Sequence, residues 1–153
     1  MGKSPFDSDR CKGVVVNPLV RVSEAASIGL HGMMLLARQP SRSLSVKDLA
    51  EALPVSSAHL AKVLQRLARM GLLLSARGPR GGFRLARAPS EYTLLQIYEA
   101  IDGPLLPGGC LMDRPVCTGT ECLFGDVLVR ATREVRERLA QTRLSDFVPP
   151  SGG

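Results

Sequence analysis

The feature that most constrains the fold is a pair of short helices, both with capping residues, followed at once by a glycine-rich hairpin. Ser45 stands three positions before an aspartate, which makes a capping box, and the apolar stretch behind it closes at Pro54. Ser56 and Ser57 can cap the next helix, whose apolar residues recur at helical spacing on one face until Gly71. Two short helices joined by a short turn, the second one amphipathic and basic, predict a helix-turn-helix.

A β-hairpin is expected directly after these two helices. A short apolar run from Leu72 to Ser75 precedes the turn Gly-Pro-Arg-Gly-Gly at residues 78–82, and Phe83 and Leu85 alternate with other residues beyond it. The turn lacks the Gly-x-Gly-x-x-Gly spacing and the Gly-Lys-Ser/Thr ending of phosphate-binding loops, so we interpret it as a tight turn. The hairpin stands where a wing would, and the expected fold is mainly α with a small β-hairpin, a winged helix-turn-helix domain.

The rest of the chain is expected to be helical, apart from its ends and one loop. Apolar spacing predicts a first helix over about residues 20–38, which Gly29 and Gly32 weaken unless another backbone packs closely there. A capping box at Thr93 opens another helix that stops at an Asp-Gly pair, and spacings of three and four predict a long last helix over 122–142. The expected organisation is a flexible leader (1–17), a winged helix-turn-helix DNA-binding domain (18–104), a cysteine loop (105–121), and a dimerisation helix with a tail (122–148).

Basic charge is concentrated on the helix-turn-helix and the hairpin. The chain carries a net charge of +6, and between Ala52 and Ser90 it has no Asp or Glu but seven Lys or Arg residues. Aromatic residues make up only 4% of the chain, too few for the stacking platforms that bind single strands, so double-stranded DNA is the expected partner. A solvated basic face is the alternative. The residues expected to contact DNA are Ser56, Ser57, His59, Lys62 and Arg66 on the helix, and Arg77, Arg80, Gly81 and Gly82 on the hairpin.

Three cysteines predict a metal centre. Cys110, Cys117 and Cys122 lie close together in a segment rich in Gly and Pro, and a loop of this kind can wrap a cluster. Three thiolates need one more donor to complete a four-ligand iron-sulfur site. The six-residue and four-residue gaps do not match the knuckles of structural zinc. We expect an iron-sulfur cluster here, with zinc or buried or redox-active thiols as alternatives, and we expect Cys11 to be a bystander.

Other classes of protein find little support. No apolar run approaches the length of a membrane span, and the first residues lack a signal-peptide core, so a cytoplasmic protein is expected. An enzyme is not expected, because the chain has only two histidines, His31 and His59, and no recognisable nucleophile or metalloprotease motif. An iron-sulfur carrier that does not bind DNA is a further alternative, but it would normally bring four cysteine ligands and has no use for a wing.

Several motifs together resemble the Rrf-two family of bacterial winged-helix transcription regulators. The resemblance runs from Val20 to Val148. It rests on the helix-turn-helix at 44–71, on Arg-Gly-Pro-Arg-Gly-Gly-Phe-Arg-Leu-Ala-Arg at 77–87, and on Leu-Leu-Gln-Ile-Tyr-Glu-Ala-Ile-Asp-Gly-Pro at 94–104. The cysteine triplet and Leu-Ser-Asp-Phe then follow in the family's order. The resemblance implies a homodimer paired along the last helix, which binds a roughly palindromic operator and changes its affinity when its cluster is altered.

The sequence departs from the family's cluster site in two ways. Members that bind a cluster space their cysteines evenly, whereas the gaps here are unequal, and no histidine follows Cys122 as it does in the cluster-assembly regulator. Ser27 stands where a nitric-oxide-sensing member has an aspartate ligand from the other subunit. The fourth ligand is therefore open among Glu24, His31, Asp126 and a small thiol, and a two-iron and a four-iron cluster are both compatible with the sequence.

Overall fold

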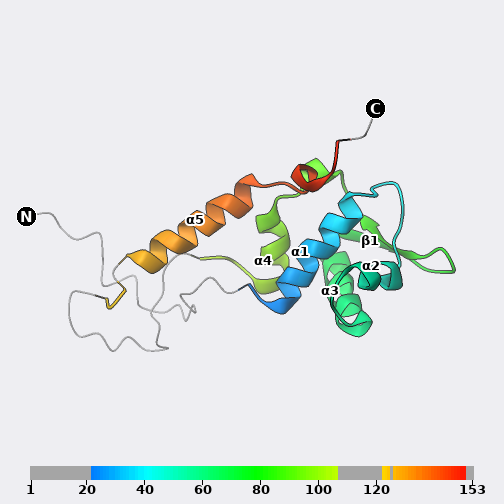
Figure 1. Cartoon of the computed structure of the whole chain (residues 1–153), viewed down its shortest axis with the longest axis horizontal. Helices are drawn as coiled ribbons and strands as arrows, with labels where there is room; N and C mark the ends of the chain where they lie inside the picture. The colour runs from blue at the N-terminus through cyan, green and yellow to red at the C-terminus, as the bar shows by residue number, and fades with distance from the viewer. Residues whose placement is uncertain (1–21, 107–121, 125, 151–153) are drawn as a thin grey trace, which may run out of the picture. The chain divides into compact units, whose positions relative to one another are not determined.

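The computed structural model describes residues 22–106, 122–124 and 126–150, which leaves the predicted leader and most of the predicted cysteine loop outside the described residues. Within this part the chain forms five α-helices, two strands and two 3-10 helices (Figure 1). In chain order they are α1 (Glu24–Ala37), α2 (Val46–Ala52), α3 (Ser57–Arg69), β1 (Leu73–Ala76), β2 (Gly82–Leu85), η2 (Pro89–Glu91), α4 (Leu94–Asp102), α5 (Val127–Gln141) and η3 (Leu144–Phe147). The chain divides into two compact units: the winged unit, built from residues 22–104 with the segment from residue 138, and a second unit containing residues 105–137.

Local sequence signals account for the starts of the helices. The hydroxyl oxygen of Ser45 accepts a hydrogen bond from the Asp48 amide (3.1 Å), and the Asp48 carboxylate accepts from the Ser45 amide in return (2.9 Å). Thr93 and Gln96 form the same reciprocal pair at the start of α4. These predicted capping boxes are confirmed. The capping box also lowers the pKa of the Asp48 carboxyl, because the hydrogen bonds from the Ser45 amide and hydroxyl favour its charged form.

Two helices begin later than the sequence predicted. The first starts at Glu24 and not near residue 20, because Ser23 is extended (φ −65°, ψ 159°) and its hydroxyl oxygen accepts from the Ala26 amide as an N-cap. The last starts at Val127 and not at 122. Its first amide bonds to the Phe124 carbonyl (3.1 Å) across a turn, so the segment before it is not helical.

The core of the winged unit lies where α1 contacts both α3 and α4. The side chains of Met33 and Leu64 from α1 and α3, and of Ile97 from α4, are fully buried there. Gly29 and Gly32 of α1 face this core, and a Cβ built on Gly29 would lie 2.2 Å from Cδ1 of Ile101. In the part of the chain that the structure describes, no other backbone approaches the α1 glycines; buried side chains pack against them, closely at Gly29 and at ordinary contact distance at Gly32.

The wing is tied to the body of this unit at its base. β1 and β2 pair antiparallel, and Phe83 of β2 also exchanges two hydrogen bonds with Leu44, of 2.9 and 2.8 Å, in an isolated bridge. The buried hydroxyl of Tyr92 donates to the Leu72 carbonyl (2.8 Å) and accepts from the Arg87 amide (2.9 Å). These contacts join β2 to the segment that precedes α2, and the two ends of the hairpin to Tyr92 just before α4.

The end of the chain returns to the winged unit, which the sequence did not predict. The Leu94 amide donates to the Thr142 carbonyl (3.0 Å), and the Leu144 amide donates to the Tyr92 carbonyl (3.1 Å). Leu144 is fully buried. The family-like motif Leu-Ser-Asp-Phe is thus the η3 turn that holds the end of the chain on this unit. Among the described residues there is no helix long and apolar enough to cross a membrane.

Candidate nucleic-acid interface

The start of α3 is built to present polar groups outward. Ser56 is the N-cap, because its hydroxyl oxygen accepts from the His59 amide (3.2 Å), and Ser57, the first residue of the helix, is exposed. The first turn holds no acidic residue. Free backbone amides and the positive end of the helix dipole at such a terminus favour a phosphate group.

One face of α3 is apolar and the other is basic. Leu60, Val63, Leu64 and Leu67 are buried against the core. The cations Lys62, Arg66 and Arg69 are exposed. The helix therefore offers a row of cations next to short polar side chains, which is the combination that a helix needs to enter a major groove.

The turn of the wing carries two exposed arginines, Arg77 and Arg80. Its glycines have a conformational role. A Cβ on Gly81 would lie 2.4 Å from the Ala76 carbonyl oxygen, and one on Gly82, whose φ is +155°, would lie 2.3 Å from the Leu44 carbonyl oxygen. The glycines thus let the turn close tightly, and the arginines project from it.

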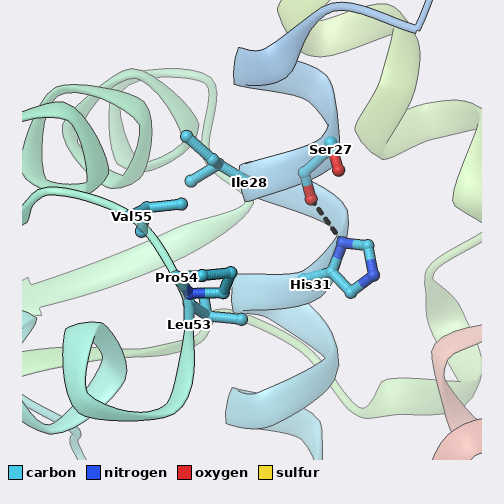
Figure 2. A pocket seen from close by; sticks show the side chains of 6 residues that line it. All are labelled: Ser27, Ile28, His31, Leu53, Pro54 and Val55. Carbon is cyan, nitrogen blue, oxygen red and sulfur yellow. Dashed lines mark hydrogen bonds between the residues drawn. The ribbon is translucent and has the colours of Figure 1, made fainter.

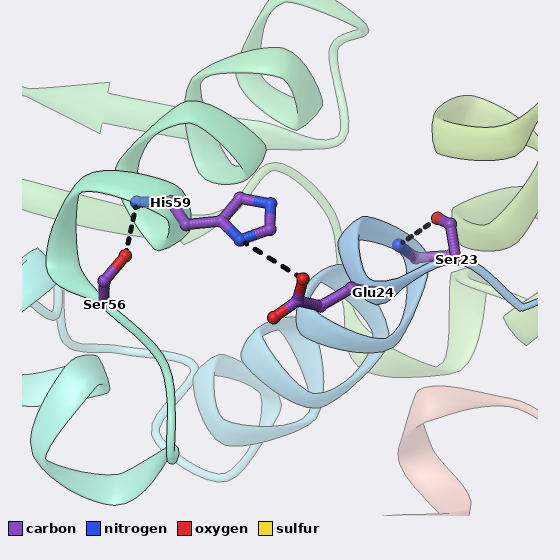
Figure 3. A network of polar contacts seen from close by, with 5 residues as sticks. Ser23, Glu24, Ser56 and His59 are labelled. Carbon is purple, nitrogen blue, oxygen red and sulfur yellow. Dashed lines mark hydrogen bonds and ion pairs between the residues drawn. The ribbon is translucent and has the colours of Figure 1, made fainter.

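Two contacts near α3 and the wing were not predicted from the sequence. The guanidinium of Arg87 lies 4.7 Å from the centre of the Tyr92 ring, a cation-π contact at the base of the wing. The carboxylate of Glu24, at the start of α1, lies beside the imidazole of His59 on α3, with 3.9 Å between Oε2 and Nδ1, and the two form an ion pair when the imidazole is protonated (Figure 3). The sequence had suggested Glu24 only as a cluster ligand, because no local pattern links positions so far apart.

The structure describes part of the predicted metal centre. Cys122 is a free, half-buried thiol, whereas Cys110 and Cys117 lie outside the described residues. Within the described residues no three His, Cys, Asp or Glu side chains gather closely enough to hold a metal ion. Of the candidate fourth donors, Glu24 is paired with His59, and Asp126 is paired with Arg130 (3.1 Å).

The third candidate, His31, is exposed and differs from the other two in its contacts. Its Nδ1 lies 2.7 Å from the carbonyl oxygen of Ser27 (Figure 2). Because a carbonyl can only accept, Nδ1 carries the proton and Nε2 keeps a lone pair in the neutral ring. Next to it is a shallow hollow of about 170 Å³, lined by Ser27, Ile28, His31, Leu53, Pro54 and Val55.

A helix-turn-helix, a wing with exposed arginines and an adjacent basic helix face define a winged helix-turn-helix DNA-binding protein. Comparison with known families then gives a match over residues 22–150 to Rrf2, described as an iron-dependent transcriptional regulator. The chain belongs to the Rrf2 family. This is a family of transcriptional regulators, and the protein is not an enzyme.

Individual relatives agree with this assignment. The chain is 31% identical over 132 residues to the HTH-type transcriptional regulator NsrR of Shouchella clausii, covering 84% of this chain and 89% of that protein. It is 42% identical to BadM of Rhodopseudomonas palustris, over 54% of this chain and about half (53%) of that protein.

Solved structures show the same fold. The structure of CymR, the global cysteine regulator of B. subtilis, has a TM-score of 0.71 at 27% identity, and the match covers 84% of this chain and 96% of that one. IscR of T. potens has a TM-score of 0.65 at 23% identity, with 84% of this chain and 85% of that chain covered. These likenesses support the predicted winged helix-turn-helix fold.

Proposed function

We propose that this protein is a cytoplasmic, homodimeric regulator whose binding to a DNA operator is switched by an iron-sulfur cluster on Cys110, Cys117 and Cys122. The DNA-binding class follows from the family and the fold. The cluster, the dimer and the residue roles are the steps that this proposal adds.

The face of α3 and the wing supports the assignment of DNA contacts. Exposed Lys62 and Arg66 suit phosphates, Ser57 and His59 suit base edges, and Arg77 and Arg80 suit a flanking groove or backbone. Ser56, Gly81 and Gly82 contribute in another way, since the serine caps the helix and the glycines close the turn.

The cysteine triplet carries the regulatory part of the proposal. The donor set suits iron, because thiolates are the ligands of iron-sulfur clusters, and Cys122 is not tied up in a disulfide among the described residues. A bound cluster would supply a centre that reacts with oxidants or nitric oxide or is lost when iron is scarce. The relative NsrR and the family's description as iron-dependent favour this reading.

Among the candidate residues for the fourth ligand, His31 is the one whose hydrogen bonding suits a metal ligand. Histidine ligands commonly donate their second ring N–H to a backbone carbonyl, and Nδ1 of His31 faces the Ser27 carbonyl at 2.7 Å. Nε2 has no partner among the described residues and is exposed. Glu24 and Asp126 would each have to leave an ion pair first.

The test is the anaerobic absorption spectrum of freshly purified protein, with iron and acid-labile sulfide assayed on the same sample. We expect charge-transfer bands, with iron and sulfide in equal amounts. Cys117→Ala should abolish the bands, and Cys11→Ala, the matched control in the leader, should keep them. A colourless wild-type protein that cannot be reconstituted would remove the cluster from the proposal.

A thiol switch is the second candidate. It keeps the DNA binding and replaces the cluster with zinc or a reversible disulfide, and the fold shared with the cysteine regulator CymR favours it. This candidate predicts iron-free protein whose operator affinity changes on oxidation and returns on reduction. An iron-sulfur carrier is disfavoured, because the chain belongs to a family of transcriptional regulators.

The proposed dimer rests on α5. Val127, Ala131 and Val135 are four residues apart and so share one face, where the first two are exposed and the third is half-buried. The same face of a second copy would cover them, as in other symmetric pairs of helices. Val135→Glu should give monomers in sedimentation velocity, and Arg133→Glu, an exposed position off this face, should leave the dimer intact.

A further inference from the structure

We propose that Glu24 is a positioning residue for DNA recognition: its carboxylate orients the imidazole of His59 at the start of the recognition helix α3. The inference concerns DNA binding alone and does not depend on the cluster. It rests on contacts within the winged unit.

His59 is held at two points. Its backbone amide is fixed by the hydroxyl oxygen of Ser56 at 3.2 Å, and its ring faces Glu24, with Nδ1 3.9 Å from Oε2 (Figure 3). The carboxylate lies on the Nδ1 side of the ring. Nε2 is left as the ring nitrogen available to a base, with no partner among the described residues. A fixed ring presents one hydrogen-bonding group in one place, and base edges are discriminated by such fixed groups.

The backbone next to Glu24, at the start of α1, is held by the end of α4. Its neighbour Ser23 donates two hydrogen bonds to the Asp102 carboxylate, one from its amide (3.0 Å) and one from its hydroxyl. The hydroxyl oxygen of Ser23 also accepts from the Ala26 amide and so caps α1. The start of α1, from which the Glu24 side chain extends toward His59, is therefore anchored to the end of α4.

Neither folding stability nor overall affinity for DNA explains why Glu24 lies beside His59. The side chain of His59 is 38% exposed and that of Glu24 is 76% exposed, and ion pairs this exposed contribute little to folding. An acidic side chain next to α3 also opposes the approach of phosphates, in a region where residues 52–90 contain no acid at all. A gain in discrimination between DNA sequences would offset that opposition.

The experiment compares two DNA duplexes. The first is selected from a random library with the full-length wild-type protein, and the second is a scrambled duplex of the same length and composition. Fluorescence anisotropy gives the affinity for each, and their ratio measures discrimination. The variants are Glu24→Gln, His59→Gln, the double variant, and Glu51→Gln as a matched control, since Glu51 on α2 is an exposed acid with no ion pair among the described residues.

We expect Glu24→Gln to lower the ratio about five-fold, the lower end of what one base contact contributes, with an unchanged melting temperature. Glu51→Gln should raise both affinities alike and leave the ratio as it was. In the His59→Gln background, Glu24→Gln should have no further effect on the ratio. The proposal is overturned if Glu24→Gln leaves the ratio unchanged, as Glu51→Gln does. It is also overturned if Glu24→Gln lowers the ratio equally in the wild type and in the His59→Gln background.

Discussion

The two glycines of α1 that face the core allow a sharp test of the packing. Replacing either with alanine improves helix propensity by about 1 kcal/mol. At Gly32 the new Cβ would lie 3.6 Å from Cδ2 of Leu64, an ordinary van der Waals contact. At Gly29 it would lie 2.2 Å from Cδ1 of Ile101, which no Cβ can occupy without a shift. Ile101 is 4% exposed, so its side chain has little room to move.

The magnitudes follow from these contacts. Gly32→Ala should stabilise the protein by about 1 kcal/mol, because the propensity gain meets no steric cost. Gly29→Ala has the same gain, but overpacking a buried site costs about 1–3 kcal/mol. The difference between the two variants isolates the steric term, and we expect it to be about 1–3 kcal/mol in favour of Gly32→Ala.

The assay is urea unfolding followed by circular dichroism, at one fixed protein concentration because a dimer's stability depends on it. Ile101→Val removes the clashing methyl group, so it should cost less in the Gly29→Ala background than in the wild type, where Ile→Val typically costs about 0.5–1.5 kcal/mol. Equal stability of the two alanine variants would refute the reasoning, since Ile101 would then yield at no cost.

Three further predictions concern the DNA-binding face, the wing and a helix cap. Lys62→Ala should weaken operator binding and reduce the slope of log affinity against log salt by about 0.9, measured by anisotropy from low to high salt; an unchanged slope would remove Lys62 from the phosphate contacts. Tyr92→Phe should destabilise the protein by about 1–3 kcal/mol in urea unfolding, because a buried hydroxyl that bonds to the Leu72 carbonyl and one amide is lost. The Ser45 hydrogen bonds lower the pKa of Asp48, so its charge stabilises the fold at neutral pH and that contribution is lost as the pH falls below about 4. Asp48→Asn should therefore lower the melting temperature at pH 7, and the gap to the wild type should close in acid; a gap that is constant with pH would contradict this.

The elements of the winged unit could be predicted because their signals are local. A cap such as Ser45 bonds to an amide three residues away, and the periodicity of α3 is visible within thirteen residues. The true starts of α1 at Glu24 and of α5 at Val127 were not predicted, because the periodicity carries no signal for them. Apolar spacing continues past the point where a cap or a turn ends the helix, and only the backbone conformation marks that point.

The sequence by itself determined the class of fold, the basic face and the cysteine triplet, since each is written in residues that are near neighbours in the chain. The tertiary structure alone decided that Glu24 meets His59, that Tyr92 locks the base of the wing, and that the chain returns at Leu144. These contacts join segments far apart in the sequence. Their partners are chosen by how the helices pack, and no local pattern of residues encodes that choice.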